Sequence, residues 1–202
     1  MHTYEAKKFN IPKLDGISEE SVKQHLALYE AYVKNFNAIS KMIAELAMAD
    51  SEKNAHAISE LVRRRSFEFD GMRLHEYYFA QFEGGAKGPA DGAAKKAFEE
   101  TYKPIGLEKV MKSIGNMRGP GWAILYYDAF GQELLTAFIG EQHQGHFATL
   151  PIVLALDVWE HSYILDYGAS GKGKYLDAFF KNLNWSVVEE RYEKLSQWKP
   201  NK

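Results

Sequence analysis

The chain has 202 residues, of which 46% are hydrophobic and 14% aromatic, so it can bury the core of one domain or of two small ones. Its formal net charge is only −2, and we therefore expect neither a basic surface for nucleic acid nor an acidic tail. The sequence has no cysteine, which excludes disulfides, iron–sulfur clusters and thiolate zinc sites. Any metal must be bound by His, Asp, Glu or water.

Membrane and export signals are also absent from the sequence pattern. No apolar run approaches the roughly 18 residues that a membrane-spanning helix needs. The opening stretch MHTYEAKKFN lacks the apolar region of a signal peptide. We therefore expect no membrane partner and no nucleic-acid partner, and a cytoplasmic location.

Two long amphipathic helices are predicted in the first part of the chain. Ser18 is a suitable N-cap for the first helix, and apolar or aromatic residues then recur at intervals of three and four, with His25 on the same stripe. A second helical pattern runs from about 55 to 82, with an interruption expected near Asp70–Gly71 and with His75 on its inner face. Together they predict an antiparallel helical hairpin with one histidine projecting inward from each arm.

The stretch EGGAKGPADGAAKK is rich in Gly, Ala and Lys, which is typical of a flexible connection. It predicts a linker at about residues 85–92 between an N-terminal helical hairpin domain, residues 1–84, and a C-terminal α/β domain, residues 93–202. A helix is expected over about 93–115, which Pro104 could break.

The C-terminal part also contains three predicted strands. The runs WAILYY and LLTAFIG, separated by DAFGQE, predict a β-hairpin, and IVLALDVW predicts a third strand. Helical spacing returns in the tail from Tyr175. The predicted fold class is α+β: an N-terminal antiparallel α-hairpin followed by a C-terminal domain with a three-stranded antiparallel sheet surrounded by helices.

The segment DVWEH places a carboxylate and an imidazole directly after an apolar run. A buried Asp costs several kcal/mol unless it is paired, hydrogen-bonded or bound to a metal, so this is either a surface corner or a cation site. Asp157 and His161, with the inward-facing His25 and His75, would supply one carboxylate and three neutral nitrogens. That set suits iron, manganese or zinc, although each histidine taken alone is more often a satisfied core residue.

Several blocks of the chain resemble the iron/manganese superoxide dismutase family, in the same order. These blocks are ISEESVKQH, AYVKNFN, GMRLHEYYF, GPGWAIL, DVWEH and YLDAFFKNLNW. The resemblance covers nearly the whole chain. It implies an enzyme that disproportionates superoxide anion to oxygen and hydrogen peroxide by alternate reduction and oxidation of one Fe or Mn ion per chain.

The resemblance also implies roles for individual residues. The ion would be bound by His25, His75, Asp157 and His161, with a solvent molecule as fifth ligand. Tyr32 matches the tyrosine at the substrate entrance, and Trp122 and Trp159 match aromatic residues that line the metal pocket. Glu160 matches the residue that reaches across a dimer to the partner's metal-binding histidine, so a homodimer or homotetramer is expected.

In the family, a glutamine or in some branches a histidine hydrogen-bonds the metal-bound solvent. Some members supply it four residues before the histidine ligand of the second helix, where this chain has Gly71, which is too small. The partner is therefore expected in GEQHQGH. Gln142 is the first choice by strand alignment, His143 the second and His146 the third, and each could instead be an ordinary loop residue.

The chain also departs from the family pattern. The Arg common after the DY pair is replaced by Gly168, so the charge that attracts superoxide is expected elsewhere, and Arg73 or Lys174 could supply it. The run Arg63 to Arg65 is interpreted as a solvated helix face rather than a substrate-guiding patch. A second histidine between His25 and Tyr32 is absent, and its tyrosine partner across the dimer is replaced by Ile164, which predicts a modified interface.

Two other functions compete with the dismutase interpretation. One is a non-catalytic metal-binding member of the same fold. The other is a zinc or di-metal hydrolase in a helical hairpin, which would need a second carboxylate cluster that the sequence does not offer. The ligands are common to iron and manganese, so the sequence does not distinguish these ions.

Overall fold

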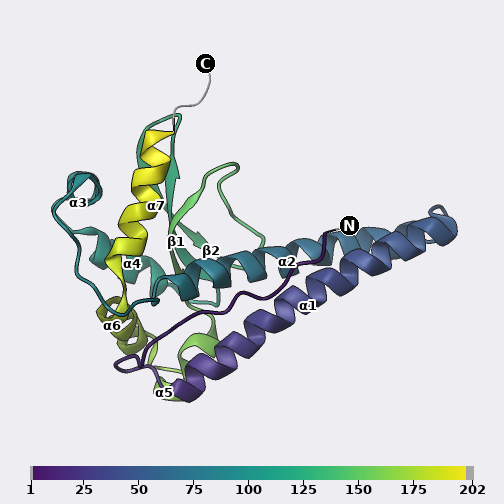
Figure 1. The fold of residues 1–202 in the computed structure, drawn as a ribbon, viewed down its shortest axis with the longest axis horizontal. Helices are drawn as coiled ribbons and strands as arrows, with labels where there is room; N and C mark the ends of the chain where they lie inside the picture. The colour runs from purple at the N-terminus through teal and green to yellow at the C-terminus, as the bar shows by residue number, and fades with distance from the viewer. Residues whose placement is uncertain (1, 199–202) are drawn as a thin grey trace.

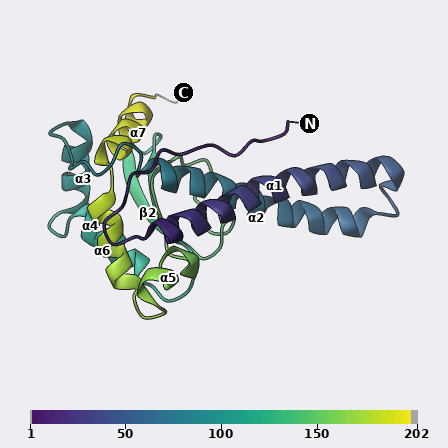
Figure 2. The same ribbon diagram turned by 60° about the horizontal axis from the view of Figure 1, so that its bottom comes forward.

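The computed structural model describes residues 2–198. Its helices α1 (Glu19–Asp50) and α2 (Ala55–Ala80) lie side by side and form an arm that projects from the rest of the molecule (Figures 1 and 2). The other elements are α3 (Ala93–Tyr102), α4 (Leu107–Gly115), β1 (Trp122–Asp128), β2 (Glu133–Ile139), β3 (Ile152–Asp157), η1 (Glu160–Ser162), α5 (Ile164–Tyr167), α6 (Lys172–Asn182) and α7 (Trp185–Gln197). This arrangement confirms the predicted α+β class.

The arm begins where the sequence predicts it. The Ser18 side chain accepts a hydrogen bond from the Ser21 N–H at 3.1 Å, which satisfies one of the free N–H groups at the start of α1. The interruption expected near Asp70–Gly71 is wrong, because α2 runs without a break from Ala55 to Ala80. A single glycine costs a helix only about 1 kcal/mol, and Gly71 is buried where α2 packs against Tyr32 of α1.

The sheet has the order β2-β1-β3, and both pairings are antiparallel, as predicted. The central strand β1 is buried at every position from Trp122 to Tyr127 because elements cover both of its faces. Its register places Trp122 opposite Asp157 of β3 and opposite Ile139 of β2. The first residue of β1 therefore lies beside the last residue of β3.

The end of α2 is joined to the edge strand β3 by one buried side chain. Gln81 accepts a hydrogen bond from the Ala155 N–H at 2.9 Å and donates one to the Ala155 carbonyl at 2.8 Å. The amide thus replaces the missing neighbouring strand at this edge. It also fixes the distance between His75 on α2 and Asp157 at the end of β3.

Two of the predicted helical segments are each divided in the structure. The region 93–115 forms α3 and α4, with Pro104 between them, so the break that Pro104 could cause does occur. The tail from Tyr175 is not one helix but α6 and α7, separated at Leu183 and Asn184. The Asn184 side chain accepts a hydrogen bond from the Ser186 N–H at 3.2 Å, so it caps a new helix where we had expected the old one to continue.

The division into residues 1–84 and 93–202 stays a prediction. Residues 85–92 connect α2 to α3, and Lys87 hydrogen-bonds through its backbone to Leu183 and Trp185. Aromatic residues of α2 also pack directly on α6, with the Tyr78 and Phe179 rings 5.8 Å apart. Among the described residues, no helix combines the length and apolar character that crossing a membrane requires.

Candidate metal centre

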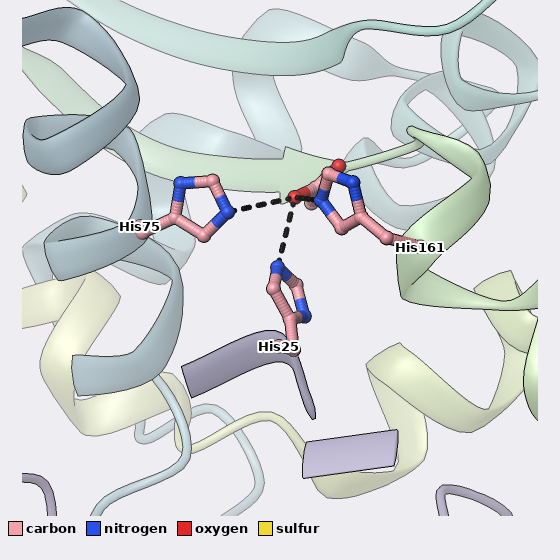
Figure 3. Close-up of side chains that lie close together, drawn as sticks. His25, His75 and His161 are labelled. Carbon is pink, nitrogen blue, oxygen red and sulfur yellow. Dashed lines mark hydrogen bonds and ion pairs between the residues drawn. The ribbon is translucent and has the colours of Figure 1, made fainter. Parts of the chain in front are cut away.

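Four residues from four separate elements meet at one point inside the molecule. His25 comes from α1, His75 from α2, Asp157 from the end of β3 and His161 from η1. Their potential ligand atoms all lie within 4.8 Å of one another. Figure 3 shows the three imidazoles directed at one carboxylate oxygen. These are the four residues that the sequence predicts as metal ligands.

The contacts in this cluster are short. The Oδ2 atom of Asp157 lies 3.0 Å from the Nε2 of His161, 3.1 Å from the Nε2 of His25 and 3.6 Å from the Nε2 of His75. Its Oδ1 atom accepts a hydrogen bond from the Trp159 N–H at 2.9 Å, which fixes the plane of the carboxylate. Asp157 and His75 are fully buried and His25 nearly so, whereas the His161 side chain is 25% exposed, so solvent reaches the cluster only on the His161 side.

The protonation of His75 shows that the cluster is suited to a cation. Its Nδ1 lies 2.6 Å from the Gly71 carbonyl, which can only accept, so Nδ1 carries the hydrogen. Burial, with the nearby His25, lowers the pKa of His75 to about 3, so the ring is neutral near pH 7. Its Nε2 therefore presents a lone pair to the Asp157 carboxylate, and this buried atom has no hydrogen-bond partner in the described structure. A metal ion would satisfy both groups.

With its three imidazoles neutral, as metal ligands must be, the cluster would present a ligand charge of about −1. Burial raises the pKa of Asp157, but the adjacent His161 and His25 outweigh burial and hold that pKa well below its ordinary value. Burial also lowers the pKa of His25, despite its contact with Asp157. One carboxylate and three imidazoles form a ligand set that suits a redox-active first-row metal ion.

A second network of hydrogen bonds adjoins the cluster. The Gln142 Nε2 donates to the Tyr32 hydroxyl at 2.6 Å, and the Trp122 Nε1 donates to the Gln142 Oε1 at 2.7 Å. The indole N–H can only donate, so it fixes which end of the amide faces Tyr32. The Tyr32 ring lies 5.1 Å from the His75 ring, measured between centroids. Tyr32 and Gln142 are therefore next to the predicted ligands.

The other two candidates in GEQHQGH make no hydrogen bond to Tyr32 or to the side-chain amide of Gln142. The His143 ring packs against Phe67 at 5.6 Å, and its Nδ1 has no hydrogen-bond partner among the described residues. His146 contacts the backbone carbonyl of Gln142 and the Tyr126 hydroxyl rather than Tyr32. Which of the three would contact a metal-bound solvent stays a prediction, and the geometry favours Gln142.

The aromatic residues predicted to line the metal pocket lie beside the cluster. The Trp159 ring is nearly parallel to the His161 ring, at 13° and 6.2 Å between centroids. The Trp122 ring meets His75 edge-on at 5.2 Å. Sequence reasoning missed Tyr175, whose hydroxyl donates to the backbone carbonyl of Asp157 at 2.8 Å. Its helical spacing indicated only a buried position.

Gly71 allows Tyr32 to occupy its position. A Cβ atom at Gly71 would lie 2.7 Å from Cδ1 of the Tyr32 ring, closer than such atoms approach in proteins. We expect Gly71→Ala to lower the free energy of unfolding, because overpacking typically costs about 1–3 kcal/mol and alanine favours a helix by only about 1 kcal/mol. Urea unfolding measures the change.

Gly173 provides the matched control for that substitution. It also lies in a helix, and a Cβ atom there would make only an ordinary contact, 3.9 Å from Asn116. We expect Gly173→Ala to be neutral or stabilising by up to about 1 kcal/mol. If Gly71→Ala were equally stabilising, Tyr32 would be shown to move aside without cost.

Comparison with known proteins agrees with this architecture. Residues 90–191 match the family model described as iron/manganese superoxide dismutases, C-terminal domain. The iron superoxide dismutase of Aquifex pyrophilus is 35% identical over 199 residues, covering 96% of this chain and 93% of that protein. The corresponding iron protein of Aquifex aeolicus is 35% identical over 185 residues, covering 90% and 86%. The manganese superoxide dismutase of Haloarcula marismortui is 29% identical over 181 residues, covering 88% and 86%. With its fold, its cluster and these relatives taken together, the chain belongs to the iron/manganese superoxide dismutase family.

Proposed function

We propose that this protein is a superoxide dismutase that uses one Fe or Mn ion, bound by His25, His75, Asp157 and His161. The observation that carries the proposal is the convergence of three imidazole Nε2 atoms on one buried carboxylate oxygen, with the His75 Nε2 unpartnered. Hydrogen bonds within the cluster leave the lone pair of the His75 Nε2 without a partner. Membership of the family supports the same reaction.

The residues around the cluster suit the chemistry of dismutation. Bound there, an iron or manganese ion would supply the reversible one-electron exchange that zinc cannot provide. Two superoxide anions and two protons give one oxygen and one hydrogen peroxide, so the site must also supply protons. The Tyr32 oxygen accepts the Gln142 N–H, so the hydroxyl hydrogen remains free to be donated. Burial and the Asp157 charge raise the pKa of Tyr32, which keeps that hydrogen in place at neutral pH.

The direct test is to prepare metal-free protein and reconstitute it separately with iron and with manganese. Metal content and dismutase activity are then measured on each form. We expect about one ion per chain and activity in at least one form. Full metal content without activity in either form would overturn the enzyme assignment and support the non-catalytic alternative. The comparison also determines which ion the protein uses, because the curated relatives include both iron and manganese proteins.

We propose Arg64 as the charge that attracts superoxide, in place of the solvated-face role that the sequence alone predicted for Arg63 to Arg65. Neither earlier candidate is favoured. Like Arg64, Arg73 is paired with a buried carboxylate, Glu76, at 2.7 Å, but its guanidinium lies over the Tyr4 and Phe69 rings. Lys174 is exposed on α6. Arg64 is half exposed and paired with Glu68, whose side chain is only 2% exposed, so the solvent-facing end of the pair is positive. Its guanidinium lies over the Phe67 ring, which packs on Tyr32.

We expect Arg64→Gln to lower kcat/KM a few-fold at low ionic strength, because a local positive charge raises the rate of encounter with an anion. The difference should vanish near 1 M salt, where the Debye length is roughly 3 Å. Arg63→Gln is the matched control, since Arg63 is exposed and pairs with the exposed Glu60. Equal rates for the two variants at low salt would exclude this role for Arg64.

We also propose a homodimer, with a homotetramer as the alternative, in which Glu160 lies at the interface. Glu160 is exposed and adjoins His161, and the nearby Ile164 and Leu165 side chains are 47% and 49% exposed. A partner chain covering this face would bury both apolar side chains. Light scattering would give the number of chains.

A cytoplasmic location is part of the same proposal, and cell fractionation would test it.

A further inference from the structure

The loop that carries Gln142 is held in place by His146. The His146 Nε2 lies 2.8 Å from the Gln142 backbone carbonyl, and its Nδ1 lies 2.7 Å from the Tyr126 hydroxyl. Between β2 and β3 the backbone is irregular, apart from one isolated bridge between Glu141 and Gln144. Side-chain contacts must therefore decide where Gln142 lies.

The hydrogen-bond directions in this chain of groups follow from the chemistry. A carbonyl can only accept, so the Nε2 of His146 carries a hydrogen and donates it to Gln142. In the neutral ring the Nδ1 then bears a lone pair and accepts from the Tyr126 hydroxyl. Tyr126 is fully buried, so the row of hydrogen bonds from Gln142 through His146 ends in the core.

Both ends of Gln142 are thus tied to the central strand β1. Trp122 and Tyr126 are four residues apart on β1, so their side chains project from the same face of the sheet. The Trp122 indole holds the side-chain amide directly, and Tyr126 holds the backbone carbonyl through His146. The buried strand is a rigid support, whereas the loop by itself is not.

We propose that His146 and Tyr126 are positioning residues that orient the Gln142 amide toward Tyr32 and the metal centre. This inference rests on the proposed function, because it assigns these residues a part in the same site. Neither residue contacts the four predicted ligands, so both act through Gln142. Without them the backbone of residue 142 would be held only by the loop, and the 2.6 Å contact with Tyr32 would lengthen.

The test compares Tyr126→Phe with Tyr127→Phe in metal-loaded protein. Each variant loses one hydroxyl from neighbouring positions of β1, but Tyr127 points to the opposite face, where its ring packs against Tyr192. We expect Tyr126→Phe to keep its metal, to lose about tenfold in dismutase activity and to shift the midpoint potential of the metal. Tyr127→Phe should leave potential and activity unchanged.

A second pair of variants tests His146 itself. His146→Leu removes the donor to the Gln142 carbonyl and should reproduce the loss of activity and the shift in potential. His146→Gln keeps an N–H group that can reach the carbonyl and should restore part of both. Faster hydrogen exchange of the backbone over residues 140–149 in the Leu variant, measured by mass spectrometry, would show that the loop has loosened.

The outcomes separate this inference from the proposed function. If the unmodified metal-loaded protein is inactive, the proposed function fails, while the potentials and exchange rates still report on Gln142. If Tyr126→Phe and His146→Leu match the unmodified protein in potential, activity and exchange, the positioning role is excluded. Equal losses in Tyr126→Phe and Tyr127→Phe would also exclude it, because the effect would then not depend on His146.

Discussion

Replacing Asp157 by asparagine is expected to remove the metal and abolish dismutase activity while leaving the shape of the site nearly unchanged. The amide has the size of the carboxylate but no charge, and only one of its two ends can bind a cation. At present one carboxylate oxygen faces the Nε2 atoms of all three histidines. The Trp159 N–H can still find an oxygen in the variant, so the local backbone should hold.

Metal content by elemental analysis and dismutase activity measure this effect. We expect metal affinity to fall by at least two orders of magnitude, since a primary ligand contributes more than the 10–100-fold typical of groups that merely support ligands. Asp70→Asn is the control, because Asp70 is partly buried, which raises its pKa, and it is not one of the four clustered residues. An Asp157→Asn protein that keeps its metal and its activity would exclude Asp157 as a ligand.

Acid is expected to destabilise the metal-free protein well before ordinary carboxylates titrate. The pKa of His75 is lowered from 6.5 to about 3 by burial, so the folded state keeps this ring neutral while the unfolded state binds a proton. The contribution of the neutral His75 ring to the free energy of unfolding is therefore fully present above pH 6.5 and is lost as the pH falls toward 3. His75 alone accounts for about 2 kcal/mol between pH 8 and pH 5, and His25, whose pKa burial also lowers, acts in the same direction.

Urea unfolding of the metal-free protein at several pH values measures this slope. Bound metal should protect the fold at mildly acidic pH, because it holds the same imidazole nitrogens in their deprotonated form. His75→Gln should flatten the pH dependence, whereas His56→Gln, at an exposed position near the start of α2, should leave it unchanged. A metal-free protein whose stability is constant from pH 7 to pH 5 would show that His75 gains access to protons without unfolding.

Local patterns account for much of what could be predicted. The three- and four-residue spacing identified α1 and α2, and two apolar runs separated by a turn sequence identified the β1–β2 hairpin. The same spacing showed that His25 and His75 face inward. Their place in one metal site with Asp157 and His161 came from resemblance to a family, because sequence spacing alone left a core histidine as the more frequent explanation.

The errors lie where long-range packing outweighs local preference. Gly71 was expected to interrupt α2, but the close approach of Tyr32 across the arm makes a glycine favourable there. Apolar spacing continued through Leu183, and only the capping bond of Asn184 shows that a new helix begins. The supporting role of His146 also had no sequence signal, since its partner Tyr126 lies 20 residues away.

The sequence by itself determined the helices of the arm, the class of fold and the residue types available to hold a metal, because periodicity and side-chain chemistry are local properties. The tertiary structure decided that His25 and Asp157, 132 residues apart, meet at 3.1 Å. It also decided which end of the Gln142 amide faces Tyr32 and which nitrogen of His75 remains without a partner. These depend on distances and donor directions, which exist only after the chain has folded.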